Sequence, residues 1–375
     1  MNVLEGVAKA AVLRPAGIPI PDGRLCRTAD EAGAAAAALG GVVVKAQIPA
    51  GKRGKSGGIR VADTAAQAKD AAHAILGMEI AGNSVASVLV EQRASVAREL
   101  YAAVLMDAVS GSLVVLLSTE GGMDIEELAA TNPAALHRHA IDVLAGFSLA
   151  DAQRLVAGVG LGAAAQGVAA ILAQLYTCFV AHDAELLEIN PLAILSDGTV
   201  RALDCKLGLD DAALVRQEPL ARLGAEERMT PLERRGRELG LKYIELDGAV
   251  GVLANGAGLT MATMDAIRHF GGQPANFLEI GGDAYTKSEP ALALVLDNPH
   301  VRSLIVNFCG AYARTDVMAA GVAAAWQKLQ PRIPVFFSIH GTGEDEAVAL
   351  VERDLAIRPF DVMDDAVRAA VEAAR

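Results

Sequence analysis

The C-terminal part of the chain repeats one pattern, in which an apolar run is followed by a helix-like segment. The apolar runs are predicted to be strands at about residues 248–254, 276–280, 302–307, 333–339 and 360–363. Helices are expected to begin near residues 259, 287, 314, 343 and 364. Apolar strands that alternate with helices form a parallel sheet with helices on both faces. We therefore predict a doubly wound α/β domain over residues 242–375.

Three of these strands are followed by turns that contain glycine. They are Asn255-Gly256-Ala257-Gly258, Gly281-Gly282-Asp283 and Cys309-Gly310-Ala311. In such sheets ligands bind beyond the carboxyl ends of the strands, where helix N-termini offer N–H groups. One glycine turn would indicate only a tight connection, but three at the same edge favour an anion site.

Residues 186–207 carry the strongest chemical signal of the N-terminal part. Two apolar strands flank a turn rich in Asp and Gly, which predicts a β-hairpin. Side chains two residues apart on a strand share one face. Each strand therefore presents one polar pair on a single face, Glu188 with Asn190 on the first and Asp204 with Lys206 on the second.

The length of the hairpin loop decides whether these pairs meet. A two-residue loop at 197–198 would place them on opposite faces. A three-residue loop at 196–198, with Gly198 left-handed, brings them together. It sets Asn190 opposite Asp204 and Glu188 opposite Lys206. We predict this longer loop, because four polar groups in apolar strands would otherwise have no common purpose. An amide oxygen facing a carboxylate then suits Mg²⁺ that also holds nucleotide phosphate. The alternative is an edge hairpin with a solvated polar face.

A second chemical signal lies in residues 42–62. The apolar strand predicted at 42–47 contains one lysine, Lys45, and a basic, glycine-rich loop at 51–58 leads into a strand at 59–62. Such a loop can fold over phosphate groups, although it lacks the GxxxxGK[ST] pattern of a P-loop. The alternative is a solvated hairpin tip. Lys45 favours phosphate binding, because a lysine inside an apolar strand needs an anionic partner.

The composition argues against some classes of protein. A net charge of −12, without a basic cluster that has aromatic partners, argues against a nucleic-acid surface. The four cysteines are scattered without zinc-type spacing, as is typical of a cytoplasmic protein. Residues 163–181 are interrupted by Gln166, Gln174 and Thr177, so a core helix is predicted rather than a membrane span.

The 375 residues are enough for two or three domains. Composition shifts in the charged, aromatic-free stretch 210–241, and we place the linker at 218–241. The domain ahead of it, residues 1–217, is predicted to contain a flap subdomain at about 20–90. Its expected elements are an amphipathic helix rather than a signal peptide at 2–14, a helix at 28–39, strands at 85–90, 97–109 and 113–118, and helices at about 124–181.

Together these segments resemble the β subunit of succinyl-CoA synthetase, from the nucleoside-diphosphate-forming acyl-CoA ligase family. The resemblance runs nearly end to end. It implies an ATP-grasp domain over residues 1–217 and a flavodoxin-like CoA-ligase domain over residues 242–375. The segments that carry it are Val44-Lys45-Ala46-Gln47, the loop 51–58, Glu188-Ile189-Asn190-Pro191-Leu192, Leu203-Asp204-Cys205-Lys206-Leu207-Gly208 and Asn255-Gly256-Ala257-Gly258-Leu259.

The resemblance also implies roles for single residues. Lys45 would contact nucleotide phosphate, and Glu188 would receive a phosphohistidine that travels between sites. The other implied residues are Lys52, Arg53, Gly54, Glu91, Ala94 and Glu99 for nucleotide binding, Asn190 and Asp204 for Mg²⁺, and Asn255, Ala311, Tyr312 and Ala313 for the acid substrate.

In this family the phosphorylated histidine belongs to a separate α subunit, which also binds CoA. None of the seven histidines here lies in a matching glycine-rich loop, so the resemblance implies such a partner, in an αβ or α2β2 complex. The implied cofactors are Mg²⁺, ATP or GTP, and CoA held mainly by the partner. Other functions to weigh are a non-catalytic, regulatory subunit and a stand-alone ATP-grasp ligase.

The acid-binding end departs from the family pattern. Glycine-glycine-isoleucine-valine-arginine is replaced by Gly310-Ala311-Tyr312-Ala313-Arg314, the second glycine turn gains Asp283, and Ser338 and His340 replace an arginine and a glutamate. Lys52 stands where glycine is usual. An added carboxylate and a lost arginine weaken binding of a dianion, by about 1 kcal/mol or more per close charge. We hypothesise a related ligase for a different acid, hydroxylated or branched, such as malate, with Tyr312, Asp283 and His340 shaping its pocket. The alternative for His340 is a solvent-facing strand end.

Overall fold

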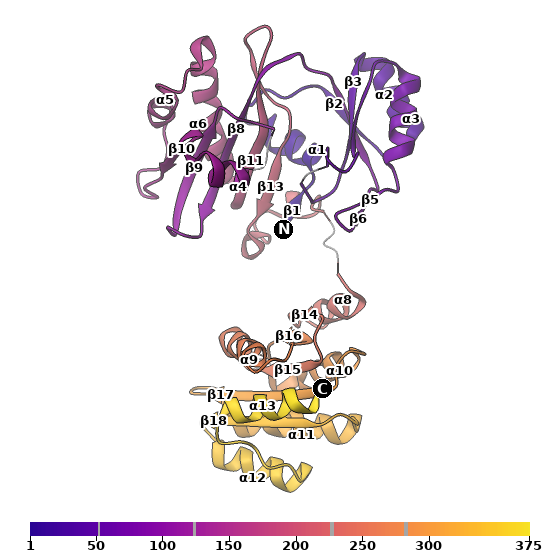
Figure 1. Cartoon of the computed structure of the whole chain (residues 1–375), viewed down its shortest axis with the longest axis vertical. Helices are drawn as coiled ribbons and strands as arrows, with labels where there is room; N and C mark the ends of the chain where they lie inside the picture. Colours follow the sequence, from indigo (N-terminus) through magenta and orange to yellow (C-terminus); the bar gives the residue numbers. More distant parts are fainter. Residues whose placement is uncertain (52, 123–124, 226–228, 281–283) are drawn as a thin grey trace. The chain divides into compact units, whose positions relative to one another are not determined.

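The computed structural model describes residues 1–51, 53–122, 125–225, 229–280 and 284–375 (Figure 1). The chain divides into two compact units, Met1–Glu227 and Arg228–Arg375. The division falls inside the charged stretch 218–241, of which α7 (Glu218–Ala221) and α8 (Pro231–Glu238) are helical. Residues 226–228 of that stretch lie outside the described residues.

A seven-stranded antiparallel sheet, the main sheet, forms the larger part of the first unit. Its order is β1-β13-β11-β8-β9-β10, and β12 pairs with β11. The strands are β1 (Asn2–Val3), β8 (Val96–Asp107), β9 (Ser112–Ser118), β10 (Leu136–Ala140), β11 (Ala184–Leu195), β12 (Val200–Ala202) and β13 (Lys206–Leu209).

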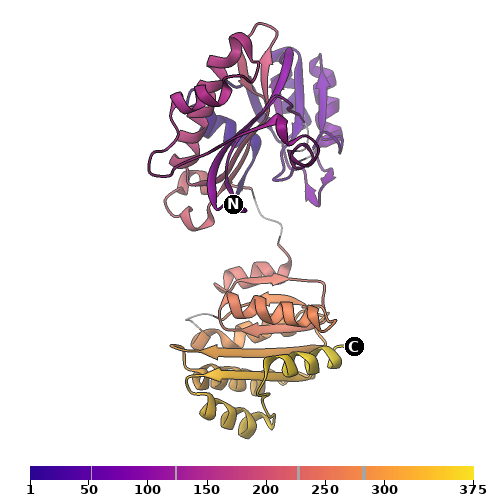
Figure 2. The ribbon, with the colours of Figure 1, turned by 60° about the vertical axis from the view of Figure 1, so that its left-hand side comes forward.

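Two helices, α5 (Leu149–Val156) and α6 (Ala165–Ala181), lie against this sheet (Figure 2). The α6 helix buries Val168, Leu172 and Leu175 in the same cluster as Leu187 of β11. The segment Gly162–Ala181 is long and apolar enough to cross a membrane by length and composition alone. Its buried face belongs to the core of the unit, as predicted for residues 163–181.

The first unit also contains a second antiparallel sheet of order β2-β7-β3-β4, and we call this sheet, two helices and the small β5-β6 sheet the flap lobe. Its core is rich in alanine, which lets α2 and α3 pack closely on the sheet. Thr28 caps α2 by accepting a hydrogen bond from Glu31 N, as the sequence predicts. The elements are β2 (Gly23–Cys26), α2 (Ala29–Leu39), β3 (Val42–Ala46), β4 (Ile59–Ala62), α3 (Ala65–Ile75), β5 (Glu79–Ile80), β6 (Asn83–Ser84) and β7 (Val88–Gln92).

Two expectations for the first unit were wrong. The N-terminus is not one amphipathic helix over residues 2–14: β1 pairs with β13, and a short helix, α1 (Glu5–Ala8), continues as a π-helical turn (Lys9–Leu13). The stretch 124–181 is not purely helical either, because β10 follows α4 (Ile125–Thr131) and extends the main sheet beside β9. Short 3₁₀ turns occur at Pro133–Ala135, Gly162–Ala164 and Asp211–Ala213.

The hairpin of residues 186–207 has the predicted register. Glu188 pairs with Lys206, and Leu192 pairs with Ala202. The loop has three residues, closed by a hydrogen bond from Leu195 N to Thr199 O at 2.8 Å. Gly198 has φ +83°, the left-handed conformation that this loop requires. The same register places Asn190 level with Asp204.

The second unit is the predicted doubly wound sheet. Strands β15 (Val250–Ala254), β17 (Ser303–Gly310) and β18 (Val335–Gly341) are parallel, β16 (Asn276–Leu278) lies parallel beside β15, and Phe360 bridges β18. One expected strand, 360–363, is reduced to that bridge, and β14 (Tyr243–Glu245) pairs antiparallel with β16. Helices α9 (Ala257–His269) and α13 (Met363–Ala373) share one core cluster, whereas α10 (Ala284–Leu296), α11 (Thr315–Leu329) and α12 (Glu344–Leu355) share another.

Candidate functional site

Lys45, the single charged residue of β3, is buried at the junction of the flap lobe and the main sheet. Its Nζ donates to Glu5 Oε1 at 3.1 Å, Glu91 Oε2 at 2.7 Å and the Leu203 carbonyl oxygen at 2.5 Å. The anionic partner that a buried lysine requires is therefore supplied by two carboxylates of the chain itself. Those three bonds use all three N–H donors of the ammonium group.

The N-terminal helix brings a second lysine to the same place. Lys9 Nζ donates to Glu5 Oε1 at 3.1 Å, to the Leu203 carbonyl oxygen at 2.9 Å and to Glu91 Oε1. Glu5 itself is only 4% exposed. The i,i+4 spacing of Glu5 and Lys9 is typical of a solvated helix face, so sequence reasoning did not place either residue in the site.

The flap arginine completes this cluster. Arg53 donates through one terminal nitrogen to Glu5 Oε2 at 2.7 Å and to the Ala46 carbonyl oxygen at 3.0 Å. Its other terminal nitrogen donates to both oxygens of Asp204, at 2.7 and 2.6 Å. The loop after β3 thus folds back onto the hairpin of the main sheet. Arg53 is 7% exposed, unlike an arginine on a solvated tip.

The charges of this cluster stabilise one another. Burial alone raises the pKa of Glu5, but Lys45, Lys9 and Arg53 outweigh it and hold that pKa well below the usual range. Burial lowers the pKa of Lys45, yet Glu5 and Glu91 outweigh it and keep the lysine charged. Asp204 differs, because burial and the charge of Glu5 raise its pKa even with Arg53 bound. A further cation beside Asp204 would therefore stabilise its charged form.

The other polar residues of the hairpin have partners from the main sheet. Asn190 Oδ1 accepts a hydrogen bond from Gly122 N at 2.7 Å, and Tyr101 Oη donates to Glu188 Oε2 at 3.1 Å. Tyr101 is buried in β8 beside the hairpin and was not found from the sequence. Asn190 and Asp204 are level in register but bind different partners. An ion shared by these two positions would have to share the Asp204 carboxylate with Arg53 or displace the arginine.

Of the remaining residues expected at the nucleotide, Glu91 belongs to this cluster and is buried beside Lys9 and Lys45. Ala94 is half-buried, and Glu99 and Gly54 are exposed. Lys52 lies outside the described residues.

The residues expected at the acid substrate lie at the carboxyl ends of β15, β17 and β18. The amide of Asn255 donates to the Cys309 carbonyl oxygen and accepts from Cys309 N, both at 2.8 Å. Arg314 binds Asp316 through two nitrogens, at 3.0 and 2.9 Å, and His340 lies 3.5 Å from Glu344. Tyr312 is fully exposed between half-buried Ala313 and exposed Ala311, and Asp283 lies outside the described residues.

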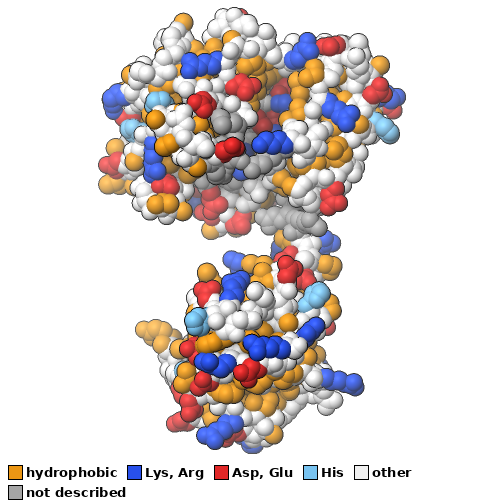
Figure 3. Space-filling view, in the orientation of Figure 1, with side chains coloured by type: hydrophobic (Ala, Val, Ile, Leu, Met, Phe, Trp, Pro, Cys, Tyr) orange, Lys and Arg blue, Asp and Glu red, His pale blue; other side chains and the backbone are white. Residues whose placement is uncertain are grey.

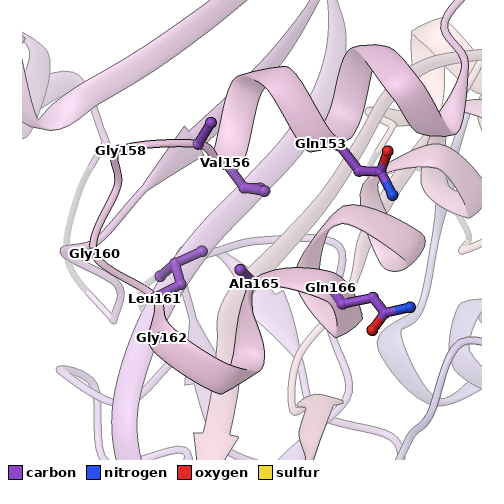
Figure 4. A pocket seen from close by; sticks show the side chains of 9 residues that line it. Gln153, Val156, Gly158, Gly160, Leu161, Gly162, Ala165 and Gln166 are labelled. Atoms are coloured by element: carbon purple, nitrogen blue, oxygen red, sulfur yellow. The ribbon is translucent and has the colours of Figure 1, made fainter.

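One hollow of about 640 Å³ lies elsewhere in the first unit, between α5 and α6 (Figure 4). Its wall combines Gln153 and Gln166 with the glycine-rich turn 158–162. None of the predicted site residues lines it. Within the described ranges, no three His, Cys, Asp or Glu side chains gather as a metal centre would require. Acidic and basic side chains are interspersed on the visible surface, unlike a nucleic-acid face (Figure 3).

Both parts of the chain match known family models. An ATP-grasp domain model matches residues 3–194, and a CoA-ligase model matches residues 253–371. In solved structures, ATP citrate lyase from Methanothrix soehngenii has a TM-score of 0.70 at 22% identity, covering 94% of this chain and 93% of that one. The Methanosaeta concilii enzyme has a TM-score of 0.72 at 20% identity, covering 94% and 92%. At this identity the likeness shows the fold.

Curated relatives are much more similar in sequence. The ADP-forming succinate–CoA ligase β subunit of Herpetosiphon aurantiacus is 41% identical, and the match covers 100% of both chains. The GDP-forming β subunit of Thermus thermophilus is 42% identical over 94% of this chain and 93% of the relative. The β subunit of Paraburkholderia xenovorans is 42% identical over 97% and 96%. The chain belongs to the succinate–CoA ligase β-subunit family.

Proposed function

We propose that this chain is the nucleotide-binding subunit of an acid–CoA ligase that couples cleavage of a nucleoside triphosphate to formation of a thioester. The observation that carries the proposal is the convergence of Lys45, Arg53 and Asp204 where the flap folds onto the hairpin. Phosphoryl transfer depends mainly on positioning and on charge stabilisation, which buried cations beside a carboxylate supply.

In this proposal Lys45 and Arg53 bind the nucleotide phosphates, together with backbone N–H groups of the flap. Asn190 and Asp204 are the residues that would hold Mg²⁺, since an amide and a carboxylate oxygen are ligands that this ion prefers. Asp204 supports the fit: burial and the charge of Glu5 raise its pKa, and a cation beside it would stabilise the charged carboxylate. When bound, the ion would neutralise charge on the phosphates. The residues support ATP and GTP equally, and relatives of both kinds exist.

A phosphorylated histidine on a CoA-binding partner subunit would carry the phosphoryl group to the acid. In this proposal Glu188 receives that histidine, and the hydrogen bond that its carboxylate accepts from Tyr101 supports the role by fixing the side chain. The acid would bind at the strand ends of the second unit. There Asp316 and Glu344 accompany Arg314 and His340, so local positive charge is low. This supports an acid other than the succinate named for the relatives.

The test uses the complex of this chain with its partner subunit. Asp204→Ala should lower nucleotide-dependent phosphorylation of the partner's histidine by about 10²-fold. Asp70→Ala, at an exposed position on α3, is the matched control and should leave it unchanged. Full phosphorylation in the Asp204 variant would instead favour a non-catalytic subunit. Acid-dependent ATP hydrolysis by this chain without a partner would favour a stand-alone ligase.

The acid is identified on the same purified complex with a panel of mono- and dicarboxylic acids. We expect a hydroxylated or branched acid to have a higher kcat/KM than succinate. If succinate is much the best substrate, the proposal of a different acid is wrong, whereas the ligase assignment stands.

A further inference from the structure

Lys9 and Lys45 donate to the same three groups, two carboxylates and one backbone carbonyl. Each donates to Glu5 Oε1, to one carboxylate oxygen of Glu91 and to the Leu203 carbonyl oxygen. The two lysines reach this common set from different parts of the unit, Lys9 from the N-terminal helical segment and Lys45 from the flap lobe. Either lysine alone could therefore satisfy the set.

Most of these contacts cross the junction between the flap lobe and the rest of the unit. Lys45 and Arg53 of the lobe bind Glu5, Arg53 binds Asp204, and Lys9 binds Glu91 of the lobe. Among the described residues of this cluster, three cations (Lys9, Lys45, Arg53) face three carboxylates (Glu5, Glu91, Asp204). The described part of the cluster therefore has no net formal charge.

Neutrality poses a problem for a phosphate site. The three donors of Lys45 are all occupied, and Arg53 is bound to Glu5 and Asp204. To bind phosphate, Lys45 must give up one of its three acceptors, two of which are carboxylates, and Arg53 has only its Nε–H outside its bonds to Glu5, Asp204 and the Ala46 carbonyl oxygen. A buried carboxylate released without a replacement cation would strongly destabilise the bound state. Lys9 is the cation that stays, since its own three bonds already reach Glu5, Glu91 and Leu203.

We propose that Glu5 and Lys9 are positioning residues that set the affinity of the phosphate site. Glu5 is the internal anion that Lys45 and Arg53 exchange for phosphate, and Lys9 is the counter-charge that holds Glu5 and Glu91 after the exchange. The proposal rests on the proposed function of the cluster. It implies that the two residues act on nucleotide affinity with opposite signs.

The experiment measures the Kd for Mg²⁺–ADP by calorimetry on the complex with the partner subunit. Glu5→Gln removes the competing anion, so binding should be about tenfold tighter. Lys9→Gln removes the counter-charge, so binding should be weaker by a similar factor. The double variant restores neutrality and should bind within about threefold of the wild type. Glu5→Asp and Lys9→Arg retain the charges, so their Kd for Mg²⁺–ADP should stay close to that of the wild type.

Asp30→Asn and Lys69→Met provide a matched control, because they change the same charges in an exposed ion pair of the flap lobe. Both should leave the Kd unchanged. Should Lys9→Gln fail to fold, Glu5→Gln and the neutral double variant still decide the matter. If both single variants weaken binding and the double is weakest, the pair has only a structural role and the inference is wrong. If the wild type does not bind Mg²⁺–ADP at all, the proposed function fails instead.

Discussion

The nucleotide end and the acid end of this chain are built differently. At the nucleotide end the clustered cations are buried, and most of their partners come from distant segments, as when Arg53 on the flap binds Asp204 on the hairpin. At the strand ends of the second unit the ion pairs are local and partly exposed: Arg314 binds Asp316 two residues on, and His340 faces Glu344 four residues on. A change in an interlocked cluster disturbs several partners at once, whereas a change in a local pair disturbs one. We therefore expect substitutions to be tolerated better at the acid end.

The largest effect is expected when the charge of Lys45 is removed from the buried cluster. Lys45→Met should lower phosphorylation of the partner's histidine by about 10²-fold or more, because the phosphate site loses a cation and Glu91 loses a partner. Single-turnover phosphorylation of the complex with labelled ATP measures the effect. Lys69→Met, in an exposed ion pair, serves as the control. Activity within threefold of the wild type would show that Lys45 is not at the reacting phosphate.

Stability should differ between the two ends in the same way. Glu91→Gln leaves Lys9 and Lys45 with one carboxylate fewer in a buried site, so the free energy of unfolding of the first unit should fall by about 3 kcal/mol. Asp316→Asn breaks a half-exposed pair and should change stability by about 0.5 kcal/mol or less. Denaturant unfolding, followed separately for each unit, measures both. Equal losses would contradict the comparison.

Tyr243, a buried titratable group of the second unit, offers a further test of the difference between the two units. Burial raises the pKa of Tyr243 to about 12, while the amide of Asn298 contacts its hydroxyl. The unfolded chain loses this proton near pH 10 and the folded chain near pH 12, so stability should be unaffected below pH 10 and should fall between them. The expected loss is about 2 kcal/mol. The measurement is the free energy of unfolding of the wild type and of Tyr243→Phe between pH 9 and 12. Parallel curves of this free energy against pH would contradict the expectation.

The smallest effect is expected at the most exposed residue of the acid end. Tyr312 is fully exposed, so Tyr312→Ala should change the KM for the acid by no more than about tenfold. The Kd for nucleotide should not change. Steady-state kinetics with acid and nucleotide varied in turn separate the two. An altered nucleotide Kd would mean that the two ends are coupled.

Features with local causes were predictable from the sequence. The hairpin register follows from loop chemistry around Gly198, and the parallel sheet follows from alternating apolar runs, since each depends on neighbouring residues. The cluster could not be predicted, because Glu5 lies 40 residues from Lys45 and 48 from Arg53. Its spacing from Lys9 is that of an ordinary exposed helix pair. Strand β10 was missed because Leu136–Ala140 carries two histidines and an arginine, without the usual alternation.

Asn255 was expected to contact the acid substrate, but its hydrogen bonds to the backbone also give it a structural role. Its amide donates one hydrogen bond to the backbone of Cys309 and accepts another from it. It thus joins the ends of two adjacent strands in the way that a further backbone pair would. A carboxylate can only accept and an aliphatic side chain can do neither, so few residues could replace it. Finding the same asparagine in another protein of this fold is therefore weak evidence about which acid that protein uses.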